Sequence, residues 1–293
     1  MTPSSDTGIS VAVLGTGIMG SAMARNLLKA GIRTVVWDRS AAPLATLATV
    51  GAKAAPSAAD AARETNIVIT MLPTPDVVNS VVIDDGVLES FRDGAVWVQM
   101  GTLGAAATDE LAGHVSKVRP DVMFVDAPVS GTKGPAEAGE LLILASGPGA
   151  AEPIVRPVFA ALGHAPRWLG PAGQGSRLKL VINAYLATMI EGVAEAQALA
   201  DQLGVDAATL DAAIEGGPLD APLADAKLHK MQRADYSPEF PLEWALKDVD
   251  LALTAAQPDT LPALAALSGA WHTAVKAGHG REDVAAAVLA LSR

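Results

Sequence analysis

The sequence predicts an α/β fold in which a doubly wound, mostly parallel sheet is followed by a long helix and an all-α region. Short apolar strand segments alternate with helical segments through the first half of the chain. A glycine-rich turn joins the first strand segment to the first helix, and no strong strand pattern occurs beyond Gly170. This alternation of strand and helix is typical of parallel sheets whose connecting helices cover both faces.

The predicted strands are short runs in which neighbouring residues are apolar, without polar residues at every second position. Such runs are expected where a strand is buried on both faces. Helical periodicity begins at Met19 and continues to Ala30, and Gly31 ends it. The predicted strands are Ser10–Leu14, Arg33–Trp37, Asn66–Leu72, Ala95–Met100, Met123–Val125 and Leu141–Ala145.

The second half reads as a series of helices, of which the first, residues 176–203, is unusually long. Further helices are separated by breaks at Gly216–Pro218, Ser237–Pro238 and Gly278–Gly280. We therefore expect a Rossmann-type domain over residues 1–171 and an all-helical substrate or dimerisation domain over residues 172–293, opening with the long helix.

Apolar side chains cover most of the circumference of the long helix, which predicts burial on several sides. A domain this small needs a second subunit to cover such a helix, so a homodimer or a homotetramer is expected. The apolar residues concerned are Leu178, Val181, Ile182, Tyr185, Leu186, Met189 and Val193.

Composition excludes several classes of protein. The 293 residues carry a net charge of −11, which disfavours broad binding to nucleic acids or anionic membranes. The absence of cysteine excludes disulfides, a thiol nucleophile and Cys-ligated zinc, and it fits a cytoplasmic protein. The N-terminal MTPSSDTG lacks the features of a signal peptide. The five histidines form no HxxxH or HExxH pair, so no metal site is expected.

The segment VAVLGTGIMGSAMARNLL contains three glycines in the G-x-G-x-x-G spacing: Gly15, Gly17 and Gly20. The first permits a tight turn, the second lets the backbone approach a pyrophosphate, and the third lets helix and strand pack closely. The helix N-terminus then offers N–H groups and a positive dipole to the phosphates. With Ile18 and Met19 between them, these residues predict a dinucleotide cradle.

The residues that follow the second strand bear on the choice of cofactor. Asp38 lies where an acid would hold the ribose hydroxyls of NAD and repel the 2′-phosphate of NADP. Arg39 and Ser40 follow directly and are suited to clamp that phosphate. We expect NADP slightly ahead of NAD.

Three further motifs occur in order: VDAPVSGTKGPAEAGEL from Val125, GQGSRLKLVINAYL from Gly173 and FPLEWALKDVDLAL from Phe240. Together with the glycine turn they resemble the β-hydroxyacid dehydrogenase family, over nearly the whole chain. That family includes 3-hydroxyisobutyrate dehydrogenases and short-chain aldehyde reductases. The resemblance implies NAD(P)-dependent interconversion of a small β-hydroxyacid and its semialdehyde or keto acid, and a C-terminal domain like that of 6-phosphogluconate dehydrogenase.

Lys179 and Asn183 are spaced i, i+4 on the long helix, so they share a face. Hydride transfer to a carbonyl requires a proton donor at the developing alkoxide, and the reverse reaction requires a base. A lysine whose pKa is lowered by burial or by nearby cations can serve both directions. The context GxGxxxKxxxN resembles the catalytic helix of the family, which implies the same role for this pair.

The resemblance also implies a binding site for the substrate carboxylate and several contacts to the cofactor. Ser130, Gly131 and Thr132 would hold the carboxylate, as a small anion nest after a strand end. Two positions depart from the family pattern: Thr132 stands where glycine is usual, and Ala184 replaces a second asparagine.

The remaining residues implied by the resemblance lie around the nicotinamide. Met71, Leu72 and Pro73 would line the cofactor channel, and Thr102 would contact the nicotinamide half. Lys247 would serve both cofactor and substrate, and Asp248 would lie beside it.

Two other functions are compatible with the same plan. An imine reductase shares the glycine turn and the WDRS segment but generally lacks the lysine, so Lys179 and DAPVSG disfavour it. A nucleotide-binding protein without catalysis would be expected to lose Lys179 or the carboxylate site.

Overall fold

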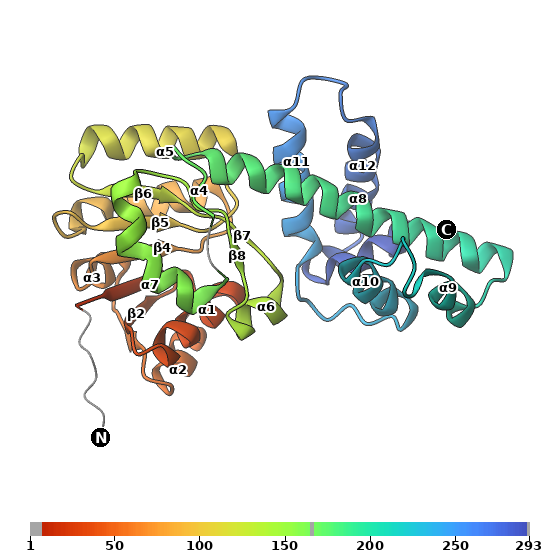
Figure 1. Cartoon of the computed structure of the whole chain (residues 1–293), viewed down its shortest axis with the longest axis horizontal. Coiled ribbons are helices and arrows are strands. Elements are labelled where there is room, and N and C mark those ends of the chain that lie inside the picture. The colour runs from red at the N-terminus through yellow and green to blue at the C-terminus, as the bar shows by residue number, and fades with distance from the viewer. Residues whose placement is uncertain (1–7, 165–166, 292–293) are drawn as a thin grey trace. The chain divides into compact units, whose positions relative to one another are not determined.

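The computed structural model describes residues 8–164 and 167–291 (Figure 1). The chain forms two compact units, residues 1–179 and residues 180–293, and each is described by itself. The first seven residues, on which the expectation about a signal peptide rests, lie outside the described part. Within that part, no helix is both long enough and apolar enough to cross a membrane.

Unit 1 is built on a six-stranded sheet in the order β3-β2-β1-β4-β5-β6, with every neighbouring pair parallel. The order reverses between β1 and β4, as a doubly wound sheet requires. The predicted fold class is therefore confirmed. The strands are β1 Ser10–Leu14, β2 Arg33–Trp37, β3 Lys53–Ala54, β4 Ile67–Thr70, β5 Val96–Gln99 and β6 Met123–Asp126.

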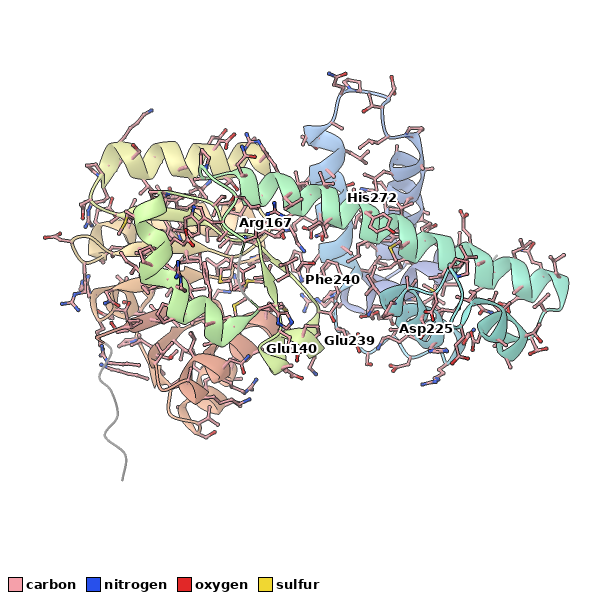
Figure 2. The ribbon with its side chains drawn as sticks, in the orientation of Figure 1. Glu140, Arg167, Asp225, Glu239, Phe240 and His272 are labelled. Atoms are coloured by element: carbon pink, nitrogen blue, oxygen red, sulfur yellow. The ribbon has the colours of Figure 1, made fainter. Side chains whose placement is uncertain are left out.

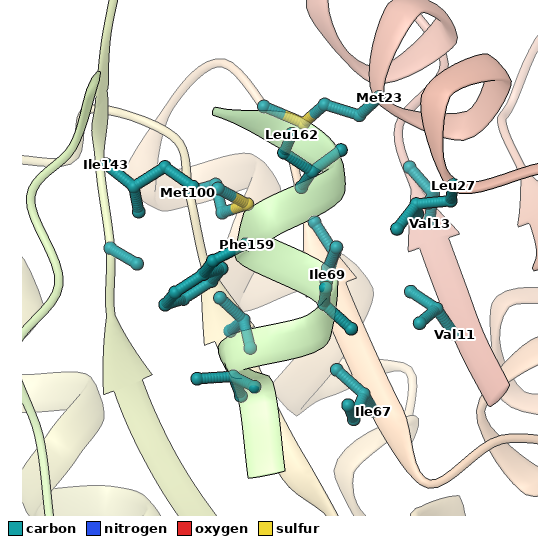
Figure 3. Close-up of a cluster of buried hydrophobic side chains, with 14 of the residues drawn as sticks. Val11, Val13, Met23, Leu27, Ile67, Ile69, Met100, Ile143, Phe159 and Leu162 are labelled. Carbon is teal, nitrogen blue, oxygen red and sulfur yellow. The ribbon is translucent and has the colours of Figure 1, made fainter. Parts of the chain in front are cut away.

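Helices cover both faces of this sheet. Residues of α1 and α7 pack on one face, where Met23, Leu27 and Phe159 meet strand residues such as Val13 and Ile69 (Figure 3). Residues of α3 and α5 pack on the other face. The helices are α1 Ile18–Lys29, α2 Ala41–Ala48, α3 Ala58–Arg63, α4 Pro75–Val78, α5 Ala105–Val118, α6 Lys133–Ala138 and α7 Glu152–Leu162.

The last predicted strand is placed differently from the expectation. Only Leu142–Ile143 is a strand, β8, and it pairs antiparallel with β7, Val129–Ser130, in a separate two-stranded sheet. Leu141, Ile143 and Ala145 are nevertheless buried in the core beside α7. The apolar pattern thus predicted burial correctly, but it could not specify the strand partner.

Unit 2 is helical throughout its described residues. The first helix, α8 Gln174–Leu203, begins in unit 1 and continues into unit 2. It is followed by α9 Ala207–Ile214, α10 Pro222–Gln232, α11 Leu242–Ala255 and α12 Pro262–Lys276, with short 3-10 segments at His279–Arg281 and Val284–Ala290. The first two predicted breaks fall between these helices, and the third, Gly278–Gly280, follows α12 and overlaps the first 3-10 segment.

The expected burial of α8 on several sides is wrong for the single chain. None of the seven apolar residues singled out in the sequence is buried, and Val181 and Tyr185 are 66% and 69% exposed. The buried face is formed instead by a mixed set of residues that includes Leu180, Ala187 and Ile190. The exposed apolar residues recur at helical spacing, so they form one stripe along α8.

Candidate active site

The glycine turn between β1 and α1 has the backbone geometry that the sequence predicts. Gly15 has a φ of +97°, and a Cβ at that position would lie 2.5 Å from the carbonyl oxygen of Met71. A Cβ on Gly20 would lie 1.9 Å from the Gly15 carbonyl oxygen. A Cβ on Gly17 would meet nothing within 4 Å. Glycine is therefore required at 15 and 20 by packing, whereas Gly17 faces open space that a ligand can enter.

The N-terminus of α1 is suited to bind an anion. Its N-cap is Gly17, whose residue type offers no side chain to bind the first N–H groups, and its first turn contains no acidic residue. Ile18 is exposed and Met19 is half-buried at this end of the helix. Free N–H groups and the helix dipole favour phosphate at such a position. The turn therefore fits the pyrophosphate of a dinucleotide.

The loops after β4 and β5 lie at the same edge of the sheet as the glycine turn, because the strands are parallel. A Cβ on Gly101 would lie 2.5 Å from the Leu72 carbonyl oxygen, so the two loops touch through their backbones. Beneath them, Thr70 Oγ1 donates to Gln99 Oε1 over 2.7 Å and accepts from Trp97 Nε1 over 2.9 Å. This buried network fixes the segments that carry Leu72, Pro73 and Thr102.

Asp38 is engaged within the protein. Its Oδ2 accepts hydrogen bonds from the backbone N–H of Thr16 (2.6 Å) and from Thr16 Oγ1 (3.1 Å). Its Oδ1 accepts from the backbone N–H of Ser40 over 2.8 Å. Arg39 and Ser40 are exposed. The Asp38 carboxylate therefore connects the end of β2 to the glycine turn. The role of Thr16 as its hydrogen-bond donor was not predicted from the sequence.

A second carboxylate missed at the sequence level, Asp126, holds the start of α8. It is 0% exposed and ends β6. Its side chain accepts from the Ser176 backbone N–H (2.8 Å), Ser176 Oγ (2.7 Å), the Gly173 backbone N–H (3.1 Å) and Ser146 Oγ (3.1 Å). Burial raises the pKa of Asp126, against the effect of these hydrogen bonds. One side chain therefore accepts several donors of this helix start, while the Gly175 N–H donates to Ser146 Oγ over 3.0 Å.

The predicted carboxylate-binding segment follows Asp126 directly in sequence. Ser130 is half-buried at the end of β7, and Gly131 is exposed with a φ of +136°. Thr132 is the N-cap residue of α6 and makes no side-chain capping bond there. Asp126 therefore anchors both the chain that leads to Ser130 and the helix turn that precedes Lys179.

Lys179 and Asn183 occupy one face of α8, one turn apart. Lys179 is 8% exposed and Asn183 is 3% exposed. Lysine and asparagine are mostly exposed in proteins, so two such buried side chains on one helix face are uncommon. Ala184, in the place of a second asparagine, is half-buried.

Asn183 is bound to a residue of α11. Its Nδ2 donates to Asp248 Oδ2 over 2.5 Å. Asp248 is 4% exposed, and its Oδ1 lies 3.0 Å from Lys247 Nζ as an ion pair. The structure thus brings three of the sequence-predicted residues together, and it does so across 65 positions of the chain.

Comparisons with known proteins show the family of the chain. Residues 10–170 match the family model for the NAD-binding domain of 6-phosphogluconate dehydrogenase. Residues 173–291 match the NAD-binding model of NADP-dependent 3-hydroxyisobutyrate dehydrogenase. Glyoxylate/succinic semialdehyde reductase 1 of Arabidopsis thaliana is 34% identical over 286 residues, which cover 97% of this chain and 98% of that protein. The chain belongs to the β-hydroxyacid dehydrogenase family.

Two solved structures that resemble the chain differ in how closely they match it. A 3-hydroxyisobutyrate dehydrogenase from Salmonella typhimurium has a TM-score of 0.88 at 27% identity, over 96% of this chain and 99% of that one. An imine reductase from Myxococcus stipitatus, in complex with NADP⁺, reaches 0.67 at 25% identity, over 97% and 100%. The hydroxyacid dehydrogenase is the better match. This β-hydroxyacid dehydrogenase family member is thus an oxidoreductase that uses a nicotinamide cofactor.

Proposed function

We propose that the protein interconverts a small β-hydroxyacid and its semialdehyde or keto acid, with Lys179 as general acid and base. The observation that carries this proposal is the buried pair Lys179 and Asn183 on one face of α8. A lysine amine is a suitable proton shuttle because it accepts a proton as a base and returns it as an acid. The names of the relatives, a semialdehyde reductase and a 3-hydroxyisobutyrate dehydrogenase, support the substrate class.

The chemistry requires one hydride and one proton to leave the alcohol. A nicotinamide held by the glycine turn would supply the hydride acceptor for the carbon that carries the hydroxyl group. Lys179 takes the hydroxyl proton as the carbonyl forms, and in the reverse direction its ammonium returns that proton to the developing alkoxide. After oxidation the ammonium releases its proton to solvent, which restores the neutral amine for the next turnover.

The other proposed roles concern orientation. Ser130, Gly131 and Thr132 bind the substrate carboxylate, and the side chain of Thr132 narrows that end of the site. Lys247 lies beside Asp248 and provides a positive charge near Asn183.

On the cofactor side, the G-x-G-x-x-G turn binds the pyrophosphate. The Met71–Pro73 loop lines the cofactor channel, and Thr102 contacts the nicotinamide half. Backbone contacts between these loops support a preformed channel, since Gly15 and Gly101 approach the carbonyl oxygens of Met71 and Leu72.

NADP is the proposed cofactor. Asp38 already accepts three hydrogen bonds from Thr16 and Ser40, so it has little capacity left for ribose hydroxyls. Arg39 is exposed next to it, and a guanidinium is suited to a phosphate dianion.

We further propose a cytoplasmic homodimer or homotetramer. Two pairs of exposed apolar residues on one side of α8, Val181 with Tyr185 and Leu199 with Leu203, support self-association, because exposed apolar surface commonly marks an interface. The lack of cysteine fits a reducing compartment. Light scattering at several protein concentrations tests the assembly, and a monomer at all of them would contradict it.

The function is tested by initial rates with 3-hydroxyisobutyrate, 3-hydroxypropionate, serine, glycerate and 4-hydroxybutyrate, and with the aldehyde acids in reverse. Lys179→Ala is expected to lower kcat by about 10²–10⁴-fold with cofactor affinity retained, because it removes the proton shuttle alone. Lys117→Ala, at an exposed position of α5, is the matched control. Wild-type turnover by Lys179→Ala would refute the assignment, and turnover of cyclic imines alone would favour an imine reductase.

Arg39→Ala tests the cofactor proposal. Loss of a charge-assisted contact to the 2′-phosphate is expected to raise the Kd for NADPH by about 10-fold or more, and to leave that for NADH nearly unchanged. Fluorescence titration of the two cofactors measures both values. Equal effects on the two would mean that Arg39 does not bind the 2′-phosphate.

A further inference from the structure

The Asn183–Asp248 pair contains a buried hydrogen-bonding atom that the fold itself does not use. Among the residues that the structure describes, Asn183 Oδ1 has no hydrogen-bond partner, although the residue is only 3% exposed. A buried acceptor without a partner is destabilising, so such atoms are few in folded proteins. Asp248 Oδ1, whose contact is the ion pair with Lys247, and Gln197 Oε1 also lack a hydrogen-bond partner. Asn183 differs from Gln197 because it lies one turn from Lys179 on the same face of α8. The unused atom therefore points to a group that arrives with the reaction.

The chemistry of Asp248 determines which atom of the Asn183 amide has no hydrogen-bond partner. An ionised carboxylate only accepts hydrogen bonds, so the NH2 group of Asn183 must face Asp248 and its oxygen must face away. The other oxygen of the same carboxylate, Oδ1, lies 3.0 Å from Lys247 Nζ as an ion pair. The orientation of the Asn183 amide thus follows from the residue opposite it.

We propose that Asp248 is a positioning residue: it holds Asn183 so that the amide oxygen accepts a hydrogen bond from an N–H or O–H group of the reacting assembly. This inference rests on the proposed function. Two groups carry such a proton, the hydroxyl of the substrate and the ammonium of Lys179, and both need an acceptor placed in a fixed direction. One N–H of the Asn183 NH2 group is bound to Asp248, and the amide oxygen is the acceptor that the pair leaves unused.

Exchange of the two side-chain types tests the orientation. In Asp248→Asn, Lys247 and Asn183 compete for one amide oxygen, and the charged donor wins. The new NH2 group then faces position 183, the Asn183 amide reverses, and the acceptor is lost. In the double variant Asn183→Asp/Asp248→Asn, that NH2 group donates to one oxygen of Asp at 183, and the other oxygen is again a free acceptor. Net charge is unchanged by the exchange.

The expected result is a loss and a rescue. Asp248→Asn lowers kcat/KM by about 10–100-fold, the value expected for one hydrogen bond to a reacting group. The double variant recovers to within about 5-fold of the wild type. Asn183→Ala loses as much as Asp248→Asn, and adding Asp248→Asn to it costs no more than about 2-fold, because the two act as one unit. If the donor is the substrate hydroxyl, KM rises for the hydroxyacid alone. If it is Lys179, kcat falls in both directions and its pH profile shifts.

The control variant is Asp250→Asn on the same helix. Asp250 accepts from Ser268 Oγ over 2.8 Å and pairs with His272 Nε2 over 3.1 Å (Figure 2 labels His272), and its change should leave kcat/KM as it is. Cofactor Kd and thermal unfolding are measured for each variant. If Asp248→Asn does not fold, Asn183→Asp carries the test: two adjacent carboxylates share a proton, so the pH profile must gain an ionisation.

Three results would overturn the inference: Asp248→Asn within 2-fold of the wild type, a double variant no better than the single one, or, in the fallback, an unchanged pH profile. A failure of the proposed function looks different, because Lys179→Ala would then turn over like the wild type. Loss in Lys179→Ala with no loss in Asp248→Asn refutes the positioning role alone.

Discussion

The two buried aspartates along α8 differ in how completely the protein satisfies them. Asp126, at the start of the helix, accepts hydrogen bonds from Ser176, Gly173 and Ser146. Asp248, beside the third turn of α8, has one hydrogen bond and one ion pair, and its partner Asn183 keeps an unused acceptor. A saturated buried carboxylate holds elements together, whereas an unsaturated pair has capacity left for chemistry.

A third buried aspartate, Asp283, behaves like Asp126. It is 0% exposed and pairs with Lys227 Nζ at 2.8 Å. It also accepts from the backbone N–H groups of Glu239 and Phe240, which Figure 2 labels in the segment before α11. Saturation therefore recurs where a carboxylate fastens a loop or a helix start. Among the described residues, the buried side-chain atoms without a hydrogen-bond partner are instead Asn183 Oδ1, Asp248 Oδ1 and Gln197 Oε1.

The same substitution at the two aspartates should separate the two roles. Asp126→Asn turns an NH2 group toward donors that need an acceptor, so the free energy of unfolding should fall by about 2–4 kcal/mol. Asp248→Asn should cost less than about 1 kcal/mol, since an amide can still bind Lys247 and Asn183 in turn. Urea unfolding of both variants measures the difference.

Equal losses of stability at the two positions would break the comparison. It would also fail if Asp248→Asn were the less stable variant, because Asp248 would then be a structural residue like Asp126. Asp109→Asn provides a reference for the same helix turn, since Asp109 pairs with Arg177 over 2.6 Å on the exposed side. Exposed pairs of this kind contribute about 0–1 kcal/mol.

The sequence was sufficient where local pattern determines the outcome. The predicted bounds of β1 and β2 agree with the structure, because continuous apolar runs next to a glycine turn leave few alternatives. The pattern failed for Leu141–Ala145, since apolar character predicts burial and not the strand partner. It failed again on α8, where apolar residues on most sides hid which face is exposed.

The contacts of the candidate site could not be read from spacing. Asp126 belongs to a motif that the sequence analysis quoted, but its donors lie about 50 positions away, at Gly173 and Ser176. Asn183 and Asp248 are 65 positions apart, and only the packing of α11 beside α8 joins them. The catalytic and binding roles, and the domain boundary at residues 171 and 172, stay predictions.

A fourth buried carboxylate, Glu191, has fewer hydrogen bonds than Asp126 or Asp283, and we expect the smallest effect from its substitution. It is 8% exposed on α8, and its Oε2 accepts from Trp271 Nε1 over 2.6 Å. Burial raises the pKa of Glu191, and the nearby charge of Glu195 adds to the increase, against the effect of the Trp271 hydrogen bond. Here a single hydrogen bond does not offset the cost of burying the charge.

Glu191→Gln should therefore stabilise the protein at neutral pH. A carboxyl with a higher pKa in the folded than in the unfolded state costs no stability below the unfolded value, about 4.3 for glutamate, and costs more as the pH rises through the folded value. The glutamine keeps an acceptor for Trp271 without the charge. The expected gain is on the order of 1 kcal/mol at pH 7.5 and vanishes toward pH 4, as measured by urea unfolding at both pH values. Glu195→Gln, one turn further at an exposed position, should give a smaller gain. A gain for Glu191→Gln that is as large at pH 4 as at pH 7.5 would mean that the charge of Glu191 is not what costs stability.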